Sequence, residues 1–334
     1  MPMKRSAWLV LLLSFLVSSC AWAINPGDLE QQLNGAGLVG WVHGASTDQG
    51  LYVFTYRNPN DFFDYIQMSL ITGDPAIQAQ LSHLTRNDKV KVQGHYLVNP
   101  SPQKHIQVTG LQMVKPYQNP YSPAPYAHEA RLPEDLLSLT EATFLVHAVG
   151  GNGHILVTEY KDSICPIFVK SATLAQGLYR GDLVKLKFKV QEVPSQPVHL
   201  SLDEAAPQPI TVLEAIKDKN GHTASFEGAL VLFPKSPEII FNVFAVQEEL
   251  VAGLKRQYTI VNMDSPTVFT QIRQALQAAW DAPRNTFING RNKLVSQKIR
   301  VRVSGTFNEV DPSQANPQIL VTDVSSVQII NAAH

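Results

Sequence analysis

Cysteine is scarce in this chain of 334 residues, which has only Cys20 and Cys165. Cys20 lies in an N-terminal segment that we expect to be removed or lipidated, so the remaining chain cannot form an internal disulfide. The fold must therefore be held together by hydrophobic cores. A catalytic thiol needs a neighbouring base, and we expect Cys165 to be a buried, small apolar residue instead.

Charged residues are also few, at 16% of the chain against about 25% in average globular proteins. The chain has 27 Lys and Arg against 28 Asp and Glu, and loss of Lys4 and Arg5 with the N-terminal segment leaves a net charge of −3. Proteins that bind polyanions over most of their surface are normally basic. The composition therefore disfavours general nucleic-acid binding but leaves room for a local basic patch.

Known catalytic motifs are missing as well. The sequence has no His-Glu-x-x-His helix, no paired Cys-x-x-Cys, no Gly-x-Ser-x-Gly turn and no phosphate-binding loop of the P-loop type. Its ten histidines are scattered without the tight spacing of metal ligands. We expect a protein that is not an enzyme and that carries no metal or cofactor.

The N-terminus has the features of an export signal. Lys4 and Arg5 precede an apolar run at 7–17, and Ala-Trp-Ala at 21–23 is a small-x-small cleavage site. These features predict a signal peptide and a periplasmic or secreted protein. In the alternative, the sequence before Cys20 resembles a bacterial lipobox, and Cys20 anchors a lipoprotein. The apolar run is shorter than the roughly 20 residues of a membrane-spanning helix, so no integral span is expected in the mature chain.

Strands that alternate basic and apolar residues occur three times in the chain. They are found at 89–92 (KVKV), 185–190 (KLKFKV) and 298–303 (KIRVRV). Alternation with a period of two is typical of a strand with one face in a core and one in water. Three copies at domain-sized spacing predict a repeated β module.

The first module predicts the order strand, strand, strand, helix, strand, strand. The strands are expected over 38–43, 51–57, 65–71, 89–96 and 105–114, with a helix that Asp74-Pro75 opens. This order resembles the OB-fold, a five-stranded Greek-key barrel. Residues 84–91 (LTRNDKVK) align without a gap to 178–185 (LYRGDLVK) in a second module. A third module is expected over about 223–330. The signal peptide and compact barrels are similar to those of exported, periplasmic bacterial OB-fold proteins.

We therefore predict a mainly β protein of three tandem OB-like five-stranded Greek-key barrels with short helices. A short helix is expected before each barrel, over Asp28–Asn34, Glu134–Thr140 and Thr211–Asp218. The expected segments are a signal peptide (1–23), a helix with barrel 1 (24–116), a Pro/Tyr-rich linker (117–133), a helix with barrel 2 (134–205), a linker helix (206–221) and barrel 3 (222–334).

The best candidate for ligand binding is the aromatic second strand of barrel 1. Tyr52, Phe54 and Tyr56 alternate beside Arg57, and Trp41 lies on the preceding strand. OB-folds that bind oligonucleotides or oligosaccharides stack them on such aromatic side chains. The alternative is that the alternating aromatic residues point into the barrel, as large aromatic residues in small barrels mostly do.

The basic strands also have two interpretations. They could form a path for an anionic polymer or a lipid surface, or they could be the solvated faces of antiparallel strands, where Lys discourages edge pairing. The candidates for an anionic partner are Lys89, Lys91, Lys185, Lys187, Lys189, Lys298, Arg300 and Arg302.

Together these features predict an exported, non-catalytic binding or adaptor protein of the bacterial cell envelope. Its barrels would engage a protein partner or an envelope ligand. The alternative is binding of single-stranded nucleic acid or an oligosaccharide through the aromatic face of barrel 1.

Overall fold

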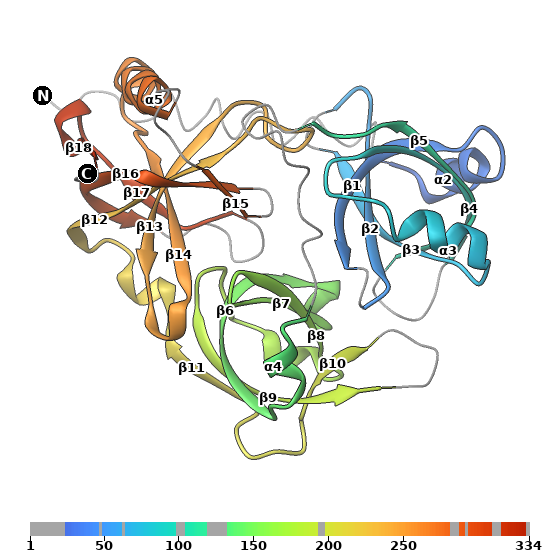
Figure 1. Ribbon diagram of the computed structural model, residues 1–334. Helices are drawn as coiled ribbons and strands as arrows, with labels where there is room; N and C mark the ends of the chain where they lie inside the picture. The colour runs from blue at the N-terminus through green and yellow to red at the C-terminus, as the bar shows by residue number, and fades with distance from the viewer. Residues whose placement is uncertain are drawn as a thin grey trace, which may run out of the picture. The chain divides into compact units, whose positions relative to one another are not determined.

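The computed structural model describes residues 24–46, 49–61, 64–97, 104–118, 132–192, 198–280, 287–290, 293–308 and 315–331. These residues form two compact units, one with the first barrel and one with the second and third barrels (Figure 1). The expected signal peptide, Cys20 and most of the Pro/Tyr-rich linker lie outside the described residues. Within the described ranges, no helix is long and apolar enough to span a membrane.

Barrel 1 is a closed ring of five strands. Their ring order is β1 (Leu38–Ser46), β2 (Leu51–Arg57), β3 (Tyr65–Ile71), β5 (His105–Lys115) and β4 (Lys89–Leu97). β3 and β5 pair in parallel, whereas β4 pairs antiparallel with both β1 and β5. Two helices accompany the ring: α2 (Pro26–Asn34) and α3 (Pro75–Leu81). As predicted, Asp74 caps α3, since its carboxylate accepts the backbone N–H of Ala76 at 2.7 Å.

Barrel 2 repeats this ring after the short helix α4 (Glu134–Leu137). Its ring order is β6 (Glu141–Gly150), β7 (Ile155–Tyr160), β8 (Ser163–Phe168), β10 (His199–Leu202) and β9 (Leu183–Gln191). A sixth strand, β11 (Ile210–Glu214), pairs with β9 outside the ring. Two 3₁₀ turns, η1 (Gly151–Gly153) and η2 (Ala172–Ala175), lie in its loops, and η2 takes the place of α3 between the third and fourth strands.

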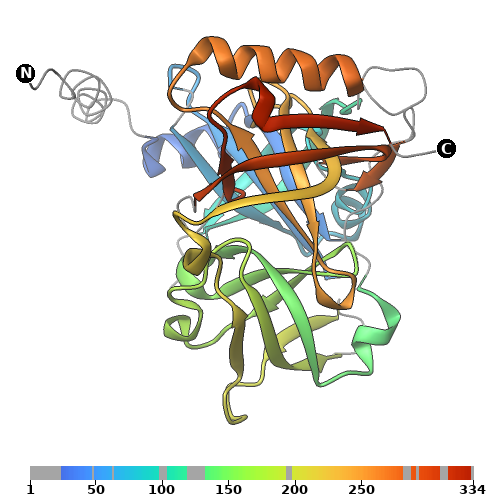
Figure 2. The same ribbon diagram turned by 90° about the vertical axis from the view of Figure 1, so that its left-hand side faces the viewer.

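Barrel 3 has the same ring with additions. Its ring order is β12 (Thr223–Phe233), β13 (Val243–Glu249), β14 (Lys255–Val261), β17 (Gln318–Leu320) and β16 (Lys293–Asn308). Outside the ring, β15 (Phe287–Gly290) and β18 (Val327–Asn331) pair with β16. The helix α5 (Pro266–Trp280) lies along this barrel and buries Ile272, Leu276 and Trp280 (Figure 2). The 3₁₀ turn η3 (Ile216–Lys219) precedes β12, η4 (Val251–Gly253) connects β13 to β14, and η5 (Val324–Ser326) precedes β18.

All three rings share one topology. The third strand pairs in parallel with the fifth, and the fifth pairs antiparallel with the fourth. This arrangement confirms the prediction of three tandem OB-like five-stranded barrels. The alternating strands are the fourth ring strand of each barrel in chain order. Their apolar residues are buried, as the period of two predicts, except Val190, which is half-buried. These buried residues are Val90, Val92, Val184, Leu186, Phe188, Ile299, Val301 and Val303.

The gapless match between barrels 1 and 2 corresponds to one shared turn. Asn87 and Gly181 occupy its equivalent positions with φ of 70° and 99°, a region that favours glycine and asparagine. The next residue accepts a backbone hydrogen bond from the first strand in both copies. Val42 N donates to Asp88 O at 2.9 Å, and Val146 N donates to Asp182 O at 2.8 Å.

The helix expected over Thr211–Asp218 is wrong. Ile210–Glu214 forms β11, and only Ile216–Lys219 makes a 3₁₀ turn, η3. The β-branched residues at 210–212 suit a strand, and their antiparallel pairing with β9 outweighs the local sequence signals that suggested a helix. The linker helix assigned to 206–221 is therefore a strand followed by a turn.

Candidate functional site

Tyr52 and Phe54 point into barrel 1, as the second interpretation of the aromatic strand expected. Their side chains are 1% and 0% exposed, and they lie in the core with Met68. Gly40 makes room for this packing, because a Cβ there would come within 2.6 Å of the Phe54 ring and 2.2 Å of the Thr55 carbonyl oxygen. A ligand on the outside of the barrel therefore cannot stack on Tyr52 or Phe54.

The remaining three of the five candidates are half-buried. Tyr56 continues the inward side of β2, and its hydroxyl lies 3.5 Å from Gln32 Oε1 of α2. Trp41 and Arg57 point outward from β1 and β2. Arg57 Cζ lies 5.9 Å from the centroid of the Trp41 ring, within the range of a cation–π contact.

Lys89, predicted separately as a contact for an anionic partner, lies at the same place. It is the register partner of Trp41 across β1 and β4, and its Nζ lies 5.8 Å from the Trp41 ring centroid. On the other side, Tyr65 of β3 is the register partner of Arg57. These four residues cross four adjacent strands in the order Tyr65, Arg57, Trp41, Lys89. We call them the cation–aromatic row.

The outward positions of the strands around the row carry positive charge and no acidic residue, whereas Asp64 and Asp88 directly precede Tyr65 and Lys89 in the chain. Lys91 is the next outward residue of β4 and pairs in register with Val39. The outward positions of the four strands are Val39, Trp41, His43, Val53, Thr55, Arg57, Tyr65, Gln67, Ser69, Lys89, Lys91 and Gln93, and none of these is acidic. The row therefore offers an indole and a phenol ring with cations between and beside them.

The other basic strands are largely neutralised within their own barrels. Lys185 pairs with Glu141 at 2.5 Å, and Lys189 pairs with Asp203 at 2.7 Å. Lys187 donates to the Pro207 carbonyl at 2.7 Å. Arg302 forms an ion pair with Glu227 on the neighbouring strand β12, while Lys298 and Arg300 are exposed on β16. An anionic partner for the barrel 2 and barrel 3 cations stays a prediction, and these pairs fit the interpretation as solvated strand faces.

A polar network that the sequence did not predict joins barrels 2 and 3. The side chain of Arg256 on β14 is only 1% exposed. It donates to Gly181 O at 2.8 Å, to Glu214 at 2.6 Å, to Glu248 at 3.1 Å and to the Tyr258 hydroxyl at 3.2 Å. Arg256 thus bonds to the shared turn of barrel 2, to β11 and to two strands of barrel 3.

The electrostatics of the junction follow from burial and from Arg256. Burial raises the pKa of Asp182, even though its carboxylate accepts the N–H groups of Tyr179 and Ile216 at 2.7 Å each. Burial also opposes ionisation of Glu214, but Arg256 and Lys219 outweigh it and leave the pKa of Glu214 below its ordinary value. The junction is therefore a built ionic site with its charges compensated.

Other contacts extend the same junction. Leu145 and Leu183 of barrel 2 pack against Leu254 of barrel 3. Glu159 and Lys293 form a buried ion pair at 3.6 Å. Because apolar packing and buried charge pairs both cross it, we expect barrels 2 and 3 to behave as one rigid body.

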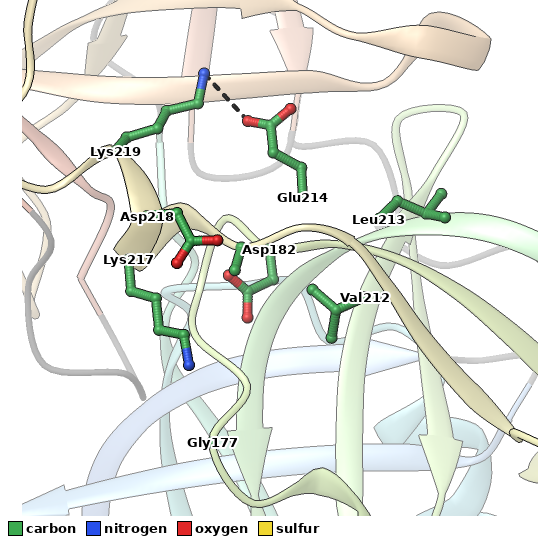
Figure 3. Close-up of a pocket in the computed structure, with 9 residues that line it drawn as sticks. Gly177, Asp182, Val212, Leu213, Glu214, Lys217, Asp218 and Lys219 are labelled. Carbon is green, nitrogen blue, oxygen red and sulfur yellow. Dashed lines mark ion pairs between the residues drawn. The ribbon is translucent and has the colours of Figure 1, made fainter.

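A pocket of about 510 Å³ opens beside this junction, at the end of β11. Figure 3 shows it bordered by Gly177 and Asp182 from barrel 2, by the end of β11 and by η3. Glu214 and Lys219 form an ion pair of 3.1 Å on its rim. The carboxylates of Asp182 and Asp218 turn toward the middle of the surrounding residues, whereas the Lys217 amine points away (Figure 3).

Among the described residues, no group of three or more His, Cys, Asp or Glu side chains is placed to hold a metal ion. Cys165 is buried, as predicted, and its Sγ lies 3.8 Å from the Ser163 carbonyl. Its packing among Phe144, Leu156 and Ile167 is that of a small core residue.

No protein-family model matches the chain, and no curated protein matches it. Several solved structures have some likeness to the chain, and three of them are as follows. A murine DNA-binding protein bound with double-stranded DNA is 14% identical, over 54% of this chain and 99% of that chain, with a TM-score of 0.19. The tetrameric p202 HIN2 is 11% identical, over 53% and 90%, with a TM-score of 0.19. Drosophila Unr CSD456 is 11% identical, over 88% and 97%, with a TM-score of 0.16. At these TM-scores, none of the three supports an argument about what this chain does.

Proposed function

We propose that the protein is an exported, non-catalytic binding protein of the cell envelope, and that barrel 1 holds single-stranded nucleic acid across the cation–aromatic row. The observation that supports this most is the position of Trp41, with Arg57 at 5.9 Å and Lys89 at 5.8 Å from its ring. Single strands are bound by aromatic rings that stack on bases and by cations that follow the phosphates.

The spacing of the row suits a short single strand. Neighbouring strands lie about 4.8 Å apart, so four strands spread the row over about 14 Å. Rings and cations alternate along it, so Tyr65 and Trp41 would stack on bases and Arg57 and Lys89 would contact phosphates. This length favours a site near the lower end of the range of about 4–16 nucleotides per OB barrel.

The chain's overall acidity limits the mode of binding. With a net charge of −3 after export, the protein would not attract nucleic acid over its whole surface. Binding would depend on the local cations Arg57, Lys89 and Lys91. The expected result is modest affinity confined to barrel 1.

An oligosaccharide is the second candidate, because Trp41 and Tyr65 could also stack on sugar rings. The adjacent cations favour the nucleic acid, since a neutral sugar makes no use of them. The two candidates differ in salt dependence: phosphate contacts release counterions, whereas sugar stacking does not.

The test measures fluorescence anisotropy of a labelled 12-nucleotide oligothymidylate with the chain from residue 24 onward. Trp41→Ala should reduce affinity about 5- to 150-fold, which corresponds to the ~1–3 kcal/mol of one base stacked on an aromatic ring. Arg57→Gln and Lys89→Gln should also weaken binding. Lys298→Gln and Arg300→Gln remove the same charge from exposed sites on β16 and should have no effect.

Circular dichroism would show that each variant is folded. Unchanged oligonucleotide affinity in a folded Trp41→Ala variant would rule out the row as the binding site. If the Trp41 variant instead loses binding of a neutral oligosaccharide, at any salt concentration, the oligosaccharide alternative replaces the nucleic acid.

A further inference from the structure

We propose that the free edge of β11 binds an extended peptide segment of a partner protein, which adds a strand to the sheet of barrel 2 and places a basic side chain in the adjoining pocket. This site lies in the second compact unit and is independent of the cation–aromatic row. It would give the protein an adaptor role in addition to ligand binding.

β11 has the features of a sheet edge open to pairing. It is the terminal strand of its sheet and pairs with β9 on one side only among the described strands. The ring of barrel 2 closes without it, through the pairing of β9 with β6 and β10. An edge of this kind presents a row of backbone N–H and C=O groups to an incoming strand.

The side chains of β11 are those of an interaction surface. Val212 and Leu213 are 45% and 49% exposed. Natural edge strands are usually protected by Lys, by Pro, by a bulge, by short length or by a covering element. β11 is short and has a bulge between Val212 and Glu214, but it contains no Lys or Pro. Two large exposed apolar residues on such an edge favour β-augmentation, in which an extended peptide gains affinity from main-chain hydrogen bonds.

The end of β11 is already held rigidly by the barrel 2–barrel 3 junction. Arg256 and Lys219 both bond to Glu214, at 2.6 Å and 3.1 Å. Two residues later, Ile216 N donates to the Asp182 carboxylate at 2.7 Å, and the Ile216 side chain is buried in the barrel 3 core. A strand held in this way is ordered before the peptide binds, so β11 itself loses little conformational entropy on binding.

The pocket at this end defines the chemistry of one partner residue. Val212 and Leu213 form one wall of the pocket, which makes it continuous with the edge. The Asp218 carboxylate turns toward its middle, and the Lys217 amine points away (Figure 3). The buried Asp182 carboxylate already accepts the N–H groups of Tyr179 and Ile216. The Lys219 amine is already paired with Glu214. Charge complementarity therefore selects a Lys or Arg side chain on the peptide.

The test uses synthetic peptides with the chain from residue 24 onward. The probe is a fluorescein-labelled peptide of alternating Val and Thr that ends in Lys, and its binding is followed by anisotropy. Two control peptides are N-methylated at alternate amides, one in each register, because only one set of amides faces β11. A third control peptide ends in Glu.

Three protein variants accompany the peptides. Val212→Lys places a charge on the edge, and Asp218→Lys reverses the charge in the pocket. Ile329→Lys is the matched control, because Ile329 is 39% exposed on β18, another strand outside the ring of its barrel.

The proposal predicts that one N-methylated register and Val212→Lys each lower affinity for the Lys peptide at least tenfold. Asp218→Lys should lower it about fivefold and remove the preference over the Glu peptide. Ile329→Lys should change nothing. Equal binding of both N-methylated registers and the parent peptide would overturn the proposal, as would an equal loss in Ile329→Lys. Concentration-dependent dimerisation that Val212→Lys abolishes, without peptide binding, would also overturn it by assigning the edge to a second copy.

Discussion

Replacement of Arg256 by methionine should uncouple barrel 2 from barrel 3. Methionine keeps much of the aliphatic volume of arginine but has no charge and no donor. Arg256 donates four hydrogen bonds, to Gly181 O, Glu214, Glu248 and the Tyr258 hydroxyl. The variant would leave two carboxylates and one carbonyl oxygen without their cationic partner.

The size of the effect follows from the burial of each partner. Removal of one member of a fully buried ion pair costs about 3–5 kcal/mol. The Glu214 and Glu248 side chains are 37% and 28% exposed, so water would compensate part of the lost interaction. A carbonyl that loses its donor adds about 1–3 kcal/mol if it remains dry. We therefore expect Arg256→Met to lower the free energy of unfolding of the second unit by about 2–4 kcal/mol.

The assay is urea unfolding of the chain from residue 24 onward. Trp280 is fully buried in barrel 3, and with Trp41→Phe as background it is the only tryptophan from residue 24 onward. With an m-value of about 3 kcal/mol/M, the Trp280 transition should move down by about 1 M urea. Arg300→Met, an exposed arginine of the same barrel, should stay within about 0.5 kcal/mol of the parent. If the two variants shift the midpoint equally, the buried network does not couple the barrels.

Two further predictions concern the junction and the core of barrel 1. The pKa of Glu214 lies below its ordinary value in the folded state, because Arg256 and Lys219 outweigh burial. Its ionised form therefore adds stability above the ordinary pKa of a glutamate, and this stability is lost as the pH falls through the folded pKa. In urea unfolding, the parent should therefore have a higher free energy of unfolding than Glu214→Gln at pH 7, and this difference should become smaller at pH 3. A difference that grows on acidification would contradict the lowered pKa of Glu214. Phe54→Ala should unfold barrel 1, at a cost of about 3–5 kcal/mol, while the Trp280 transition stays in place. A folded Phe54→Ala barrel that only loses a ligand would place this ring on the surface instead.

The fold was predictable because its signals are local and repeated. Alternation of basic and apolar residues gives the strand faces directly, and the shared turn at Asn87 and Gly181 depends on a left-handed conformation that few residue types accept. The orientation of the aromatic side chains on β2 was harder to predict. Tyr52 and Phe54 alternate equally well inward or outward, and only the closed ring, with Gly40 opposite Phe54, decides between the two.

The junction could not be predicted from the sequence. Arg256 lies 75 residues from Gly181 and 42 from Glu214 in the chain, and no local pattern links partners at such distances. The error at β11 has the same origin. The helix there was predicted from local sequence signals, whereas the pairing of β11 with β9 is a tertiary contact that local propensity does not contain. Three of the four row residues were predicted: Trp41 and Arg57 were candidates in one set and Lys89 in another, and only the strand register brings the two sets together.

We propose that Trp41 and its neighbouring cations form a binding site for single-stranded nucleic acid. The most direct measurement is the slope of log affinity against log salt for oligothymidylate, in the parent chain and in Lys89→Gln. Contacts from Arg57, Lys89 and Lys91 to three phosphates predict a slope of about −2, at roughly −0.7 per phosphate. Lys89→Gln should reduce its magnitude by about 0.7 while Lys298→Gln leaves it unchanged. Absence of measurable binding at low salt, or an identical slope in Lys89→Gln, would contradict the claim.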